Sequence, residues 1–144
     1  MAHEDAGHYA AKHPEGTEVD PEINQKLQKK IIEGKISCAA AHAIAGELKV
    51  APEQVGIAID LMEARILKCQ LGLFGYQPEK CIVKPAENPS AEVTSAINAQ
   101  LVDGRIACRK CWELADTLGI KKMDASSVCE GIGVKINKCQ LGAF

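Results

Sequence analysis

The heptapeptide KCQLGLF at residues 68–74 occurs again as KCQLGAF at residues 138–144, where the chain ends. Shifting the sequence by 70 residues superimposes the two heptapeptides, and the match continues towards the N-terminus without a gap to about residue 20. Self-similarity at a fixed period indicates tandem copies of one structural unit. The expected parts of the chain are, in order, a polar N-terminal arm (1–19), a first repeat (20–74), a linker with three prolines (75–89) and a second repeat (90–144).

Length and composition limit the class of protein. Each repeat has about 55 residues, which is close to the lower limit for independent folding, so we expect the copies to share a core. Aromatic residues make up 3% of the 144 residues, so alanine and aliphatic side chains must supply most of the burial, as in closely packed helices. No apolar run is long enough to span a bilayer and no signal peptide is present. We therefore expect a cytoplasmic protein without a membrane partner, in which the seven cysteines are thiols or metal ligands.

Start and stop signals predict three helices and a terminal strand in each copy. Asp20-Pro21 and Ser90-Ala91 are typical helix N-termini, and apolar residues follow them at a spacing of four. Second helices are expected from Cys38 and Cys108, and third helices from about Pro52 and Asp124. The heptapeptide tails look extended. Because the second copy ends at Phe144 without a local partner strand, we expect the two tail strands to pair with each other across a pseudo-twofold axis.

A resemblance to a known family rests on the second and third helices. The first copy has Ala45, Leu48, Val50 and Val55 at the positions that are small or apolar in the helix-turn-helix of bacterial winged-helix DNA-binding domains, and the second copy keeps Ala115, Leu118, Gly119 and Ile120 there. Lys49 stands where glycine is usual, and Ala125 stands at the anchor position of the second copy. The tail K-C-Q-L-G-x-F is similar to the signature of a little-characterised bacterial family of such repeats. The expected fold is therefore mainly α, with two tandem three-helix helix-turn-helix (winged-helix-like) repeats, each ending in a short β-strand, packed as a pseudo-twofold pair.

The resemblance implies binding of double-stranded DNA by a regulatory or accessory protein, with the duplication replacing the usual homodimer. In that family the third helix enters the major groove and flanking cations contact phosphates. The expected groove contacts are Gln54, Lys121 and Lys122, and the expected phosphate contacts are Arg65, Lys68, Lys135 and Lys138.

Charge favours an alternative function. The net charge is −2, with seven bases and seven acids in residues 20–74 and seven bases and six acids in residues 90–144. The third helix of the first copy carries Glu53, Asp60 and Glu63, which would repel phosphates at short range. The alternative is a non-enzymatic adaptor that binds a protein partner through its third helices. We expect no enzymatic activity, because the sequence has no phosphate-binding glycine loop, no carboxylate pair in an apolar setting and no nucleophile motif.

The cysteines leave a third possibility, a metal or redox sensor. Two cysteines recur in both copies, and each copy adds one further thiol or imidazole ligand to them. The candidate metal ligands are Cys38, His42 and Cys69 in the first copy and Cys108, Cys111 and Cys139 in the second. Three ligands leave a tetrahedral zinc site one short. Cys111 and Cys129 align with Ala41 and Ile59, so filling of the core explains them without a metal.

Three histidines in the N-terminal arm, His3, His8 and His13, recur at intervals of five. On a helix, such residues point about 140° apart and do not converge on one metal ion. We therefore expect residues 1–19 to be a solvated arm.

Overall fold

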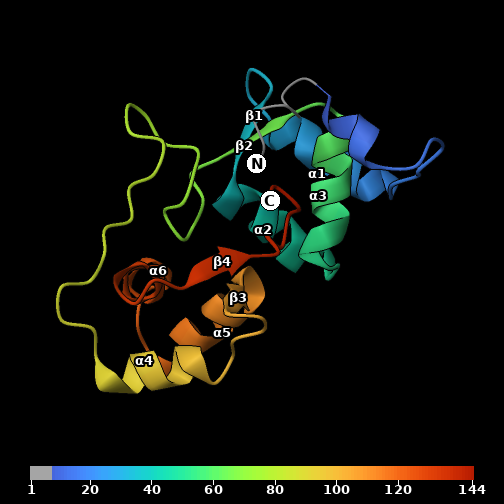
Figure 1. The fold of residues 1–144 in the computed structure, drawn as a ribbon. Coiled ribbons are helices and arrows are strands. Elements are labelled where there is room, and N and C mark those ends of the chain that lie inside the picture. Colours follow the sequence, from blue (N-terminus) through green and yellow to red (C-terminus); the bar gives the residue numbers. More distant parts are fainter. Residues whose placement is uncertain (1–7) are drawn as a thin grey trace. The chain divides into compact units, whose positions relative to one another are not determined.

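The structure is a computed structural model that describes residues 8–144 (Figure 1). The described chain is mainly helical, with short strands between the helices. It divides into two compact units: unit 1 comprises the chain up to Cys69 together with Gln140–Phe144, and unit 2 comprises Gln70–Cys139. No helix within residues 8–144 combines the length and the apolar character needed to cross a membrane.

Both units contain helix, strand, helix, helix and strand in the same order. In unit 1 these elements are α1 (Pro21–Lys30), β1 (Lys35–Ser37), α2 (Cys38–Leu48), α3 (Pro52–Leu61) and β2 (Arg65–Leu67), preceded by the 3-10 helix η2 (Tyr9–Lys12). In unit 2 they are α4 (Ala91–Asn98), β3 (Arg105–Ala107), α5 (Cys108–Leu118), α6 (Lys122–Gly131) and β4 (Lys135–Asn137).

Local chemistry explains where the helices begin. The Asp20 carboxylate accepts a hydrogen bond from the Glu22 N–H at 2.9 Å, and Pro21 takes the first helical position of α1. The Ser37 hydroxyl accepts from the Ala40 N–H at 3.1 Å and caps α2. The predicted starts of the first and second helices are confirmed.

The core of each unit is aliphatic. The largest fully buried side chains of unit 1 include Ile23, Leu27 and Ile59, and those of unit 2 include Ile97 and Ile106. Ile23 and Leu27 lie one helical turn apart on the buried face of α1, as the spacing of four predicts. Burial of each such side chain contributes about 1.5–3 kcal/mol, so these side chains supply much of the burial in both units.

The strands pair within each unit and not between the tails. Strand β1 lies parallel to β2, and β3 lies parallel to β4 (Figure 1). The expected pairing of the two tail strands with each other is therefore wrong. The strands are also shorter than the extended tails suggest. Lys68 and Lys138, the residues that directly follow β2 and β4, take left-handed backbone conformations with φ of 52° and 49°.

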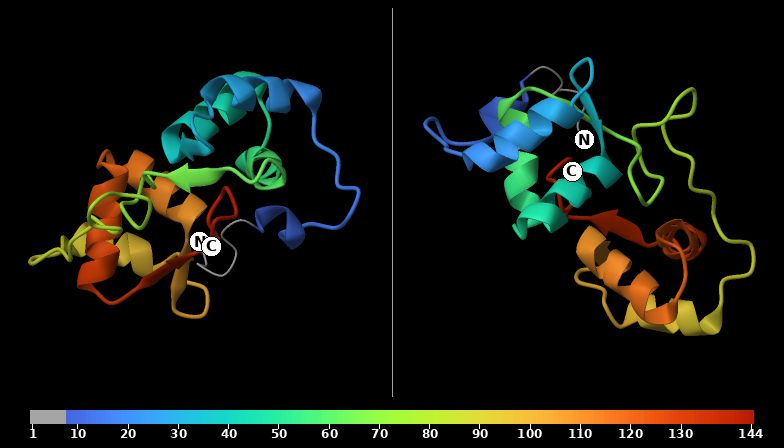
Figure 2. Two further views of the ribbon diagram at one scale, coloured as in Figure 1. Left: turned by 90° about the horizontal axis from the view of Figure 1, so that it is seen from above. Right: turned by 180° about the vertical axis from the view of Figure 1, so that it is seen from behind.

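The residues that follow each tail strand belong to the other unit. Gln140–Phe144, at the end of the second repeat, pack in unit 1, where they lie beside α3 in both views of Figure 2. Gly56 of α3 is in such close contact with Leu141 that an added Cβ atom would overlap the Leu141 carbonyl group. Residues 70–74, from the first repeat, pack in unit 2, where Gly72 approaches Met123 of α6. The sequence repeats therefore differ from the compact units at their tails.

Residues 9–13 of the N-terminal arm are attached to α3 and to Glu63, which follows that helix, and this differs from the expected solvated arm. Tyr9 is 3% exposed. Its backbone N–H and that of Ala10 each donate to the Glu63 carboxylate at 2.8 Å. His13 Nε2 lies 2.8 Å from Asp60 Oδ2. His8 is exposed, and His3 lies outside the described residues. Two of the three acids expected to repel phosphates, Asp60 and Glu63, thus hold residues 9–13 in place.

Acid is expected to weaken the attachment of Tyr9 and Ala10 by protonating Glu63. The hydrogen bond from the Ala10 N–H is the main cause that holds the pKa of the Glu63 carboxyl below its ordinary value. Desolvation opposes it, and the Tyr9 N–H adds a smaller lowering effect. A lowered pKa in the folded state means that the contact stabilises the fold above the ordinary glutamate pKa, and that this contribution is lost as the pH falls through the lowered pKa. An NMR titration of the Tyr9 and Ala10 amides should show this loss in that acidic range.

The matched variants for this titration are Glu63→Gln and Glu22→Gln. Glu63→Gln removes the titrating group, so the two amide resonances should lose their acid transition. Glu22→Gln alters an exposed acid of α1 that does not contact the arm and should keep the transition. An unchanged acid transition in Glu63→Gln would contradict the assignment.

Candidate functional site

A tight turn precedes the first strand of each unit. Ile32 and Lys35 exchange two backbone hydrogen bonds of 2.9 and 3.0 Å, and Val102 and Arg105 do the same at 2.8 and 3.0 Å. The two central residues of each turn have left-handed φ values, 53° and 75° in unit 1 and 52° and 75° in unit 2. Two consecutive left-handed residues are the geometry of a type I′ hairpin turn. The turn reverses the chain after the first helix and directs it into β1 or β3.

Each strand pair presents two cations on its exposed face. Lys35 is paired with Arg65 across β1 and β2, and Arg105 is paired with Lys135 across β3 and β4. Ile36 and Ile106, the next residues of β1 and β3, are buried, so the cations point to the opposite, exposed face. Side chains at paired positions of adjacent strands are close neighbours, and like charges there repel each other. Each unit thus places two positive charges side by side on solvent.

These cations have no acidic partner among residues 8–144. None of the four forms an ion pair with a carboxylate of the described chain. Lys35 aligns with Arg105 and Arg65 aligns with Lys135, so each position keeps its charge while the residue type changes between the copies. We refer to Lys35, Arg65 and Lys68 as the basic face of unit 1, and to Arg105, Lys135 and Lys138 as the basic face of unit 2.

Unit 2 has a hollow beside its basic face. Its volume is about 430 Å³, and Arg105, Lys110 and Lys138 contribute its positive charge. The same hollow is lined by one acid, Asp103, and by two amide side chains, Gln100 and Asn137. A hollow with three cations and one acid favours an anionic group over a neutral one. Arg105 can also hold two oxygens of such a group at once.

Exposed aliphatic side chains flank both basic faces. Ile32 is 73% exposed and Val102 is 67% exposed, and each lies at the start of its turn, three residues before a strand cation. The two positions are equivalent in the repeats. Single exposed aliphatic side chains are common on protein surfaces, so it is their recurrence at equivalent positions that distinguishes these two.

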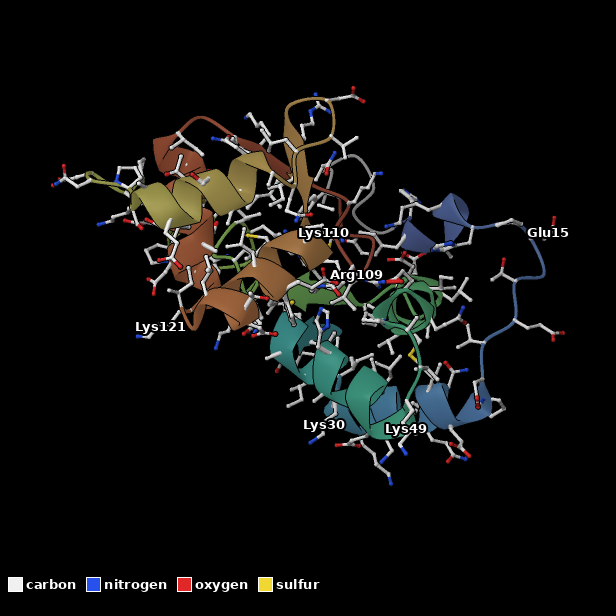
Figure 3. The ribbon with its side chains drawn as sticks, turned by 90° about the horizontal axis from the view of Figure 1, so that it is seen from below. Glu15, Lys30, Lys49, Arg109, Lys110 and Lys121 are labelled. Carbon is white, nitrogen blue, oxygen red and sulfur yellow. The ribbon has the colours of Figure 1, made fainter. Side chains whose placement is uncertain are left out.

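The expected groove-contact residues lie at the starts of the third helices and not on the strand pairs. Gln54 is exposed in the first turn of α3. Lys121 is exposed at the start of α6, and Lys122 places its ammonium 4.6 Å from the centre of the Trp112 ring. Lys110 lies in the first turn of α5, and Lys121 lies beyond the last turn of that helix. Figure 3 shows the two lysines at opposite ends of α5.

The third helices are also enclosed by other segments of the chain. Residues 9–13 and Leu141 cover α3. In unit 2 the Ala86 N–H donates to the Ser127 carbonyl at 3.0 Å, and the Ser127 hydroxyl donates to the Lys84 carbonyl at 2.6 Å. The linker therefore runs along α6. A helix covered in this way offers less surface to a groove than the expected major-groove contact requires.

The six candidate metal ligands are not brought together. Residues 8–144 contain no group of three or more His, Cys, Asp and Glu side chains placed to hold a metal ion. Cys38, Cys69, Cys108 and Cys111 are buried, and Cys139 is half-buried. Cys111 and Cys129 are fully buried in the core of unit 2, and the Cys111 side chain holds the pKa of the Cys129 thiol below its ordinary value.

The sequence interpretation included Arg65, Lys68, Lys135 and Lys138 but missed Lys35 and Arg105. A strand of three residues is too short to show alternation of apolar and polar side chains. One signal was present: Asp103-Gly104 is a typical dipeptide of two-residue hairpin turns, and a strand is expected directly after it. This signal predicts Arg105 as the first residue of a strand.

Comparison with known proteins found no matching family model, no matching curated protein and no matching solved structure.

Proposed function

We propose that the chain binds double-stranded DNA as a regulatory or accessory protein, and that the basic faces of both units contact its phosphates. The observation that supports this proposal is the repeated pair of cations on adjacent strands, Lys35 with Arg65 and Arg105 with Lys135. Two like charges held side by side cost free energy unless an anion neutralises them. A phosphate backbone is such an anion.

The exchange of lysine and arginine between the copies supports phosphate contact over base recognition. Arginine and lysine differ in shape and hydrogen-bonding pattern, so a base edge in the major groove distinguishes them. A phosphate requires mainly positive charge. The proposal therefore predicts binding with little sequence preference at these positions.

The proposal retains the helix-turn-helix interpretation of each repeat and changes the surface of contact. The two-helix motif is α2 with α3 in the first repeat and α5 with α6 in the second. Because other segments cover α3 and α6, we assign the contacts to the strand pairs that follow the turns at Ile32 and Val102.

Measurement of duplex binding over a range of salt concentrations tests this function. Each phosphate contact contributes about −0.9 to the slope of log K against log salt concentration. The six cations of the two basic faces predict a slope of about −5. Binding of a labelled duplex of arbitrary sequence, followed by fluorescence anisotropy, gives this slope. A slope close to zero, or no retention at low salt, would remove the proposal.

A second candidate function, binding of a protein partner, is supported by the exposed Ile32 and Val102. Burial of two aliphatic side chains does not release counterions, so the affinity for such a partner would change little with salt. The variants Ile32→Ser and Val102→Ser separate the two functions, because they should abolish contact with a partner protein and leave the salt slope for duplex DNA unchanged.

A further inference from the structure

The hollow of unit 2 continues into a second depression. This depression has a volume of about 230 Å³, and Ala96 of α4 and Leu114 of α5 are among the residues that line it. We call it the apolar groove. It shares Ala99, Gln100 and Lys110 with the hollow of about 430 Å³ beside the basic face. One ligand with an anionic part and a less polar part can therefore occupy both.

The charge of the hollow matches a phosphate monoester. Arg105, Lys110 and Lys138 line it, and Asp103 adds one acid, so two positive charges remain in excess. Lys110 also lies 3.5 Å from the Glu113 carboxylate, but both side chains are exposed and such a pair is weak. A phosphate monoester carries a charge of about −1.5 to −2 at pH 7, whereas a phosphate within a strand carries one negative charge. The hollow therefore fits a terminal phosphate better than an internal one.

The apolar groove has the lining that a nucleobase requires. Ala96 and Leu114 offer apolar surface, and Gln100, Glu113 and Thr117 add hydrogen-bonding groups. An apolar lining with a few polar groups is typical of sites for small molecules. A base uses both kinds of contact, because its faces pack on apolar side chains and its edges donate and accept hydrogen bonds. An alkyl chain would use only the apolar side chains.

The first repeat has different residues at the equivalent positions of the hollow. Lys110 and Asn137 align with Ala40 and Leu67. A cation and an amide of the second repeat are thus two aliphatic side chains in the first. The basic faces recur in both units, but the composition of the hollow belongs to unit 2.

The equivalent positions of the apolar groove differ as well. Ala96 and Thr117 align with Lys26 and Glu47, which form an ion pair of 3.0 Å between α1 and α2. In unit 1 an ion pair therefore joins the two helices at positions where unit 2 has two small side chains that line the groove.

We propose that the hollow and the apolar groove of unit 2 together bind a nucleoside 5′-phosphate, as a free nucleotide or as the terminal nucleotide of a 5′-phosphorylated DNA strand. The phosphate lies in the hollow, where Arg105 donates to two of its oxygens. The base lies in the groove against Ala96 and Leu114. In its strand-end form this inference rests on the proposed binding of duplex DNA, and in its free-nucleotide form it does not.

Two labelled duplexes that differ at one 5′ end test the strand-end form with the full chain. One carries a 5′-phosphate and the other a 5′-hydroxyl, and the fluorescent label is on the other 5′ end. At roughly 0.15 M salt the phosphate should tighten binding about tenfold, because charge-assisted hydrogen bonds to it are added. The ratio of the two affinities is the readout, so general attraction between the protein and DNA cancels.

Deoxyadenosine 5′-phosphate tests the free-nucleotide form. Titration followed by amide NMR should shift the resonances of residues 99–103 and 113–117, which belong to the hollow and the groove. The nucleotide should bind about tenfold more tightly than inorganic phosphate, because the base adds contacts in the groove. Tighter binding of octyl phosphate than of the nucleotide would overturn the assignment of the groove to a base.

Two matched variants copy the first repeat. Lys110→Ala with Asn137→Leu should abolish the preference for the 5′-phosphate. Ala96→Lys with Thr117→Glu leaves the net charge unchanged and copies the ion pair of unit 1, so it should fold and bind the nucleotide no better than inorganic phosphate. The control Lys29→Ala removes an exposed lysine of α1 and should keep both preferences.

The outcomes separate this inference from the proposed function. Equal affinity for the two duplexes, together with no binding of the nucleotide, would overturn the inference and leave salt-dependent duplex binding in place. A phosphate preference that survives Lys110→Ala with Asn137→Leu would also overturn it. Binding of the nucleotide by a chain that retains neither duplex would support the site and refute the proposed function.

Discussion

Replacement of Gly56 by alanine is expected to destabilise unit 1 by about 2–3 kcal/mol, because it forces an atom into the space of the C-terminal tail. A Cβ at Gly56 would overlap the Leu141 carbonyl oxygen and lie 2.7 Å from the carbonyl carbon and 2.9 Å from the Leu141 Cα. These are backbone atoms, so no rotation of a side chain relieves the overlap. Either α3 or the tail must move, and Leu141, 2% exposed, then loses burial. Urea unfolding measures the change.

The matched control is Gly46→Ala. Gly46 is exposed in α2, and an added Cβ would meet nothing within 4 Å. Alanine favours a helix over glycine by about 0.5–1 kcal/mol, so this variant should be more stable than the natural chain. Equal stabilisation by both substitutions would show that the tail does not pack on α3. Removal of Gln140–Phe144 should abolish the difference between the two sites.

The second repeat shows that this close approach is a particular feature of unit 1. Ser126 of α6 occupies the position equivalent to Gly56 and is fully buried. Unit 2 therefore has space for a side chain at a position where unit 1 has none. Near-identical tails thus pack against third helices that differ at this contact.

The helices were predictable because their signals are local. Asp20 and Ser90 cap the helices that follow them, and their hydroxyl or carboxylate oxygens accept the expected backbone hydrogen bonds. The spacing of Ile23 and Leu27 placed the buried face of α1 correctly. Such signals depend on residues within one or two turns of each other, and those are visible in a sequence.

The packing of the tails was not predictable for a physical reason. The heptapeptides at residues 68–74 and 138–144 differ only at Leu73 and Ala143, so each offers almost the same apolar residues to either unit. Which unit a tail joins is decided by the chain direction after the left-handed Lys68 and Lys138 and by long-range packing. Local propensity carries no information on that choice.

The candidate site was only half predictable for a related reason. Positive charge near the tails was evident from Arg65, Lys68, Lys135 and Lys138. Their partners Lys35 and Arg105 lie about 30 residues earlier in the sequence, and only the parallel pairing of β1 with β2 and of β3 with β4 brings them alongside. Two parallel strands need a long connection between them, which here consists of the second and third helices. The register in which the two strands pair is not visible in a sequence of three strand residues.

Reversal of charge on one basic face, with Arg105→Glu and Lys135→Glu together, is expected to weaken duplex binding about 100-fold at roughly 0.1 M salt. The two side chains lie on paired positions of β3 and β4 and point to solvent, so the substitutions remove two phosphate contacts with little effect on the fold. The slope of log K against log salt concentration should become shallower by about 2, since each lost contact removes about one counterion. The corresponding variant of unit 1, Lys35→Glu with Arg65→Glu, should behave in the same way.

The control must change the net charge equally without touching a basic face. Lys29→Glu with Lys84→Glu meets this condition, because both lysines are exposed, one at the end of α1 and one in the linker. General attraction between the protein and DNA would weaken equally in the control and in the face variants. Specific phosphate contacts would weaken the affinity in the face variants alone and would make only their salt slope shallower. Loss of affinity in all variants to the same extent would therefore exclude the basic faces as the contact surface while leaving an electrostatic attraction to DNA in place.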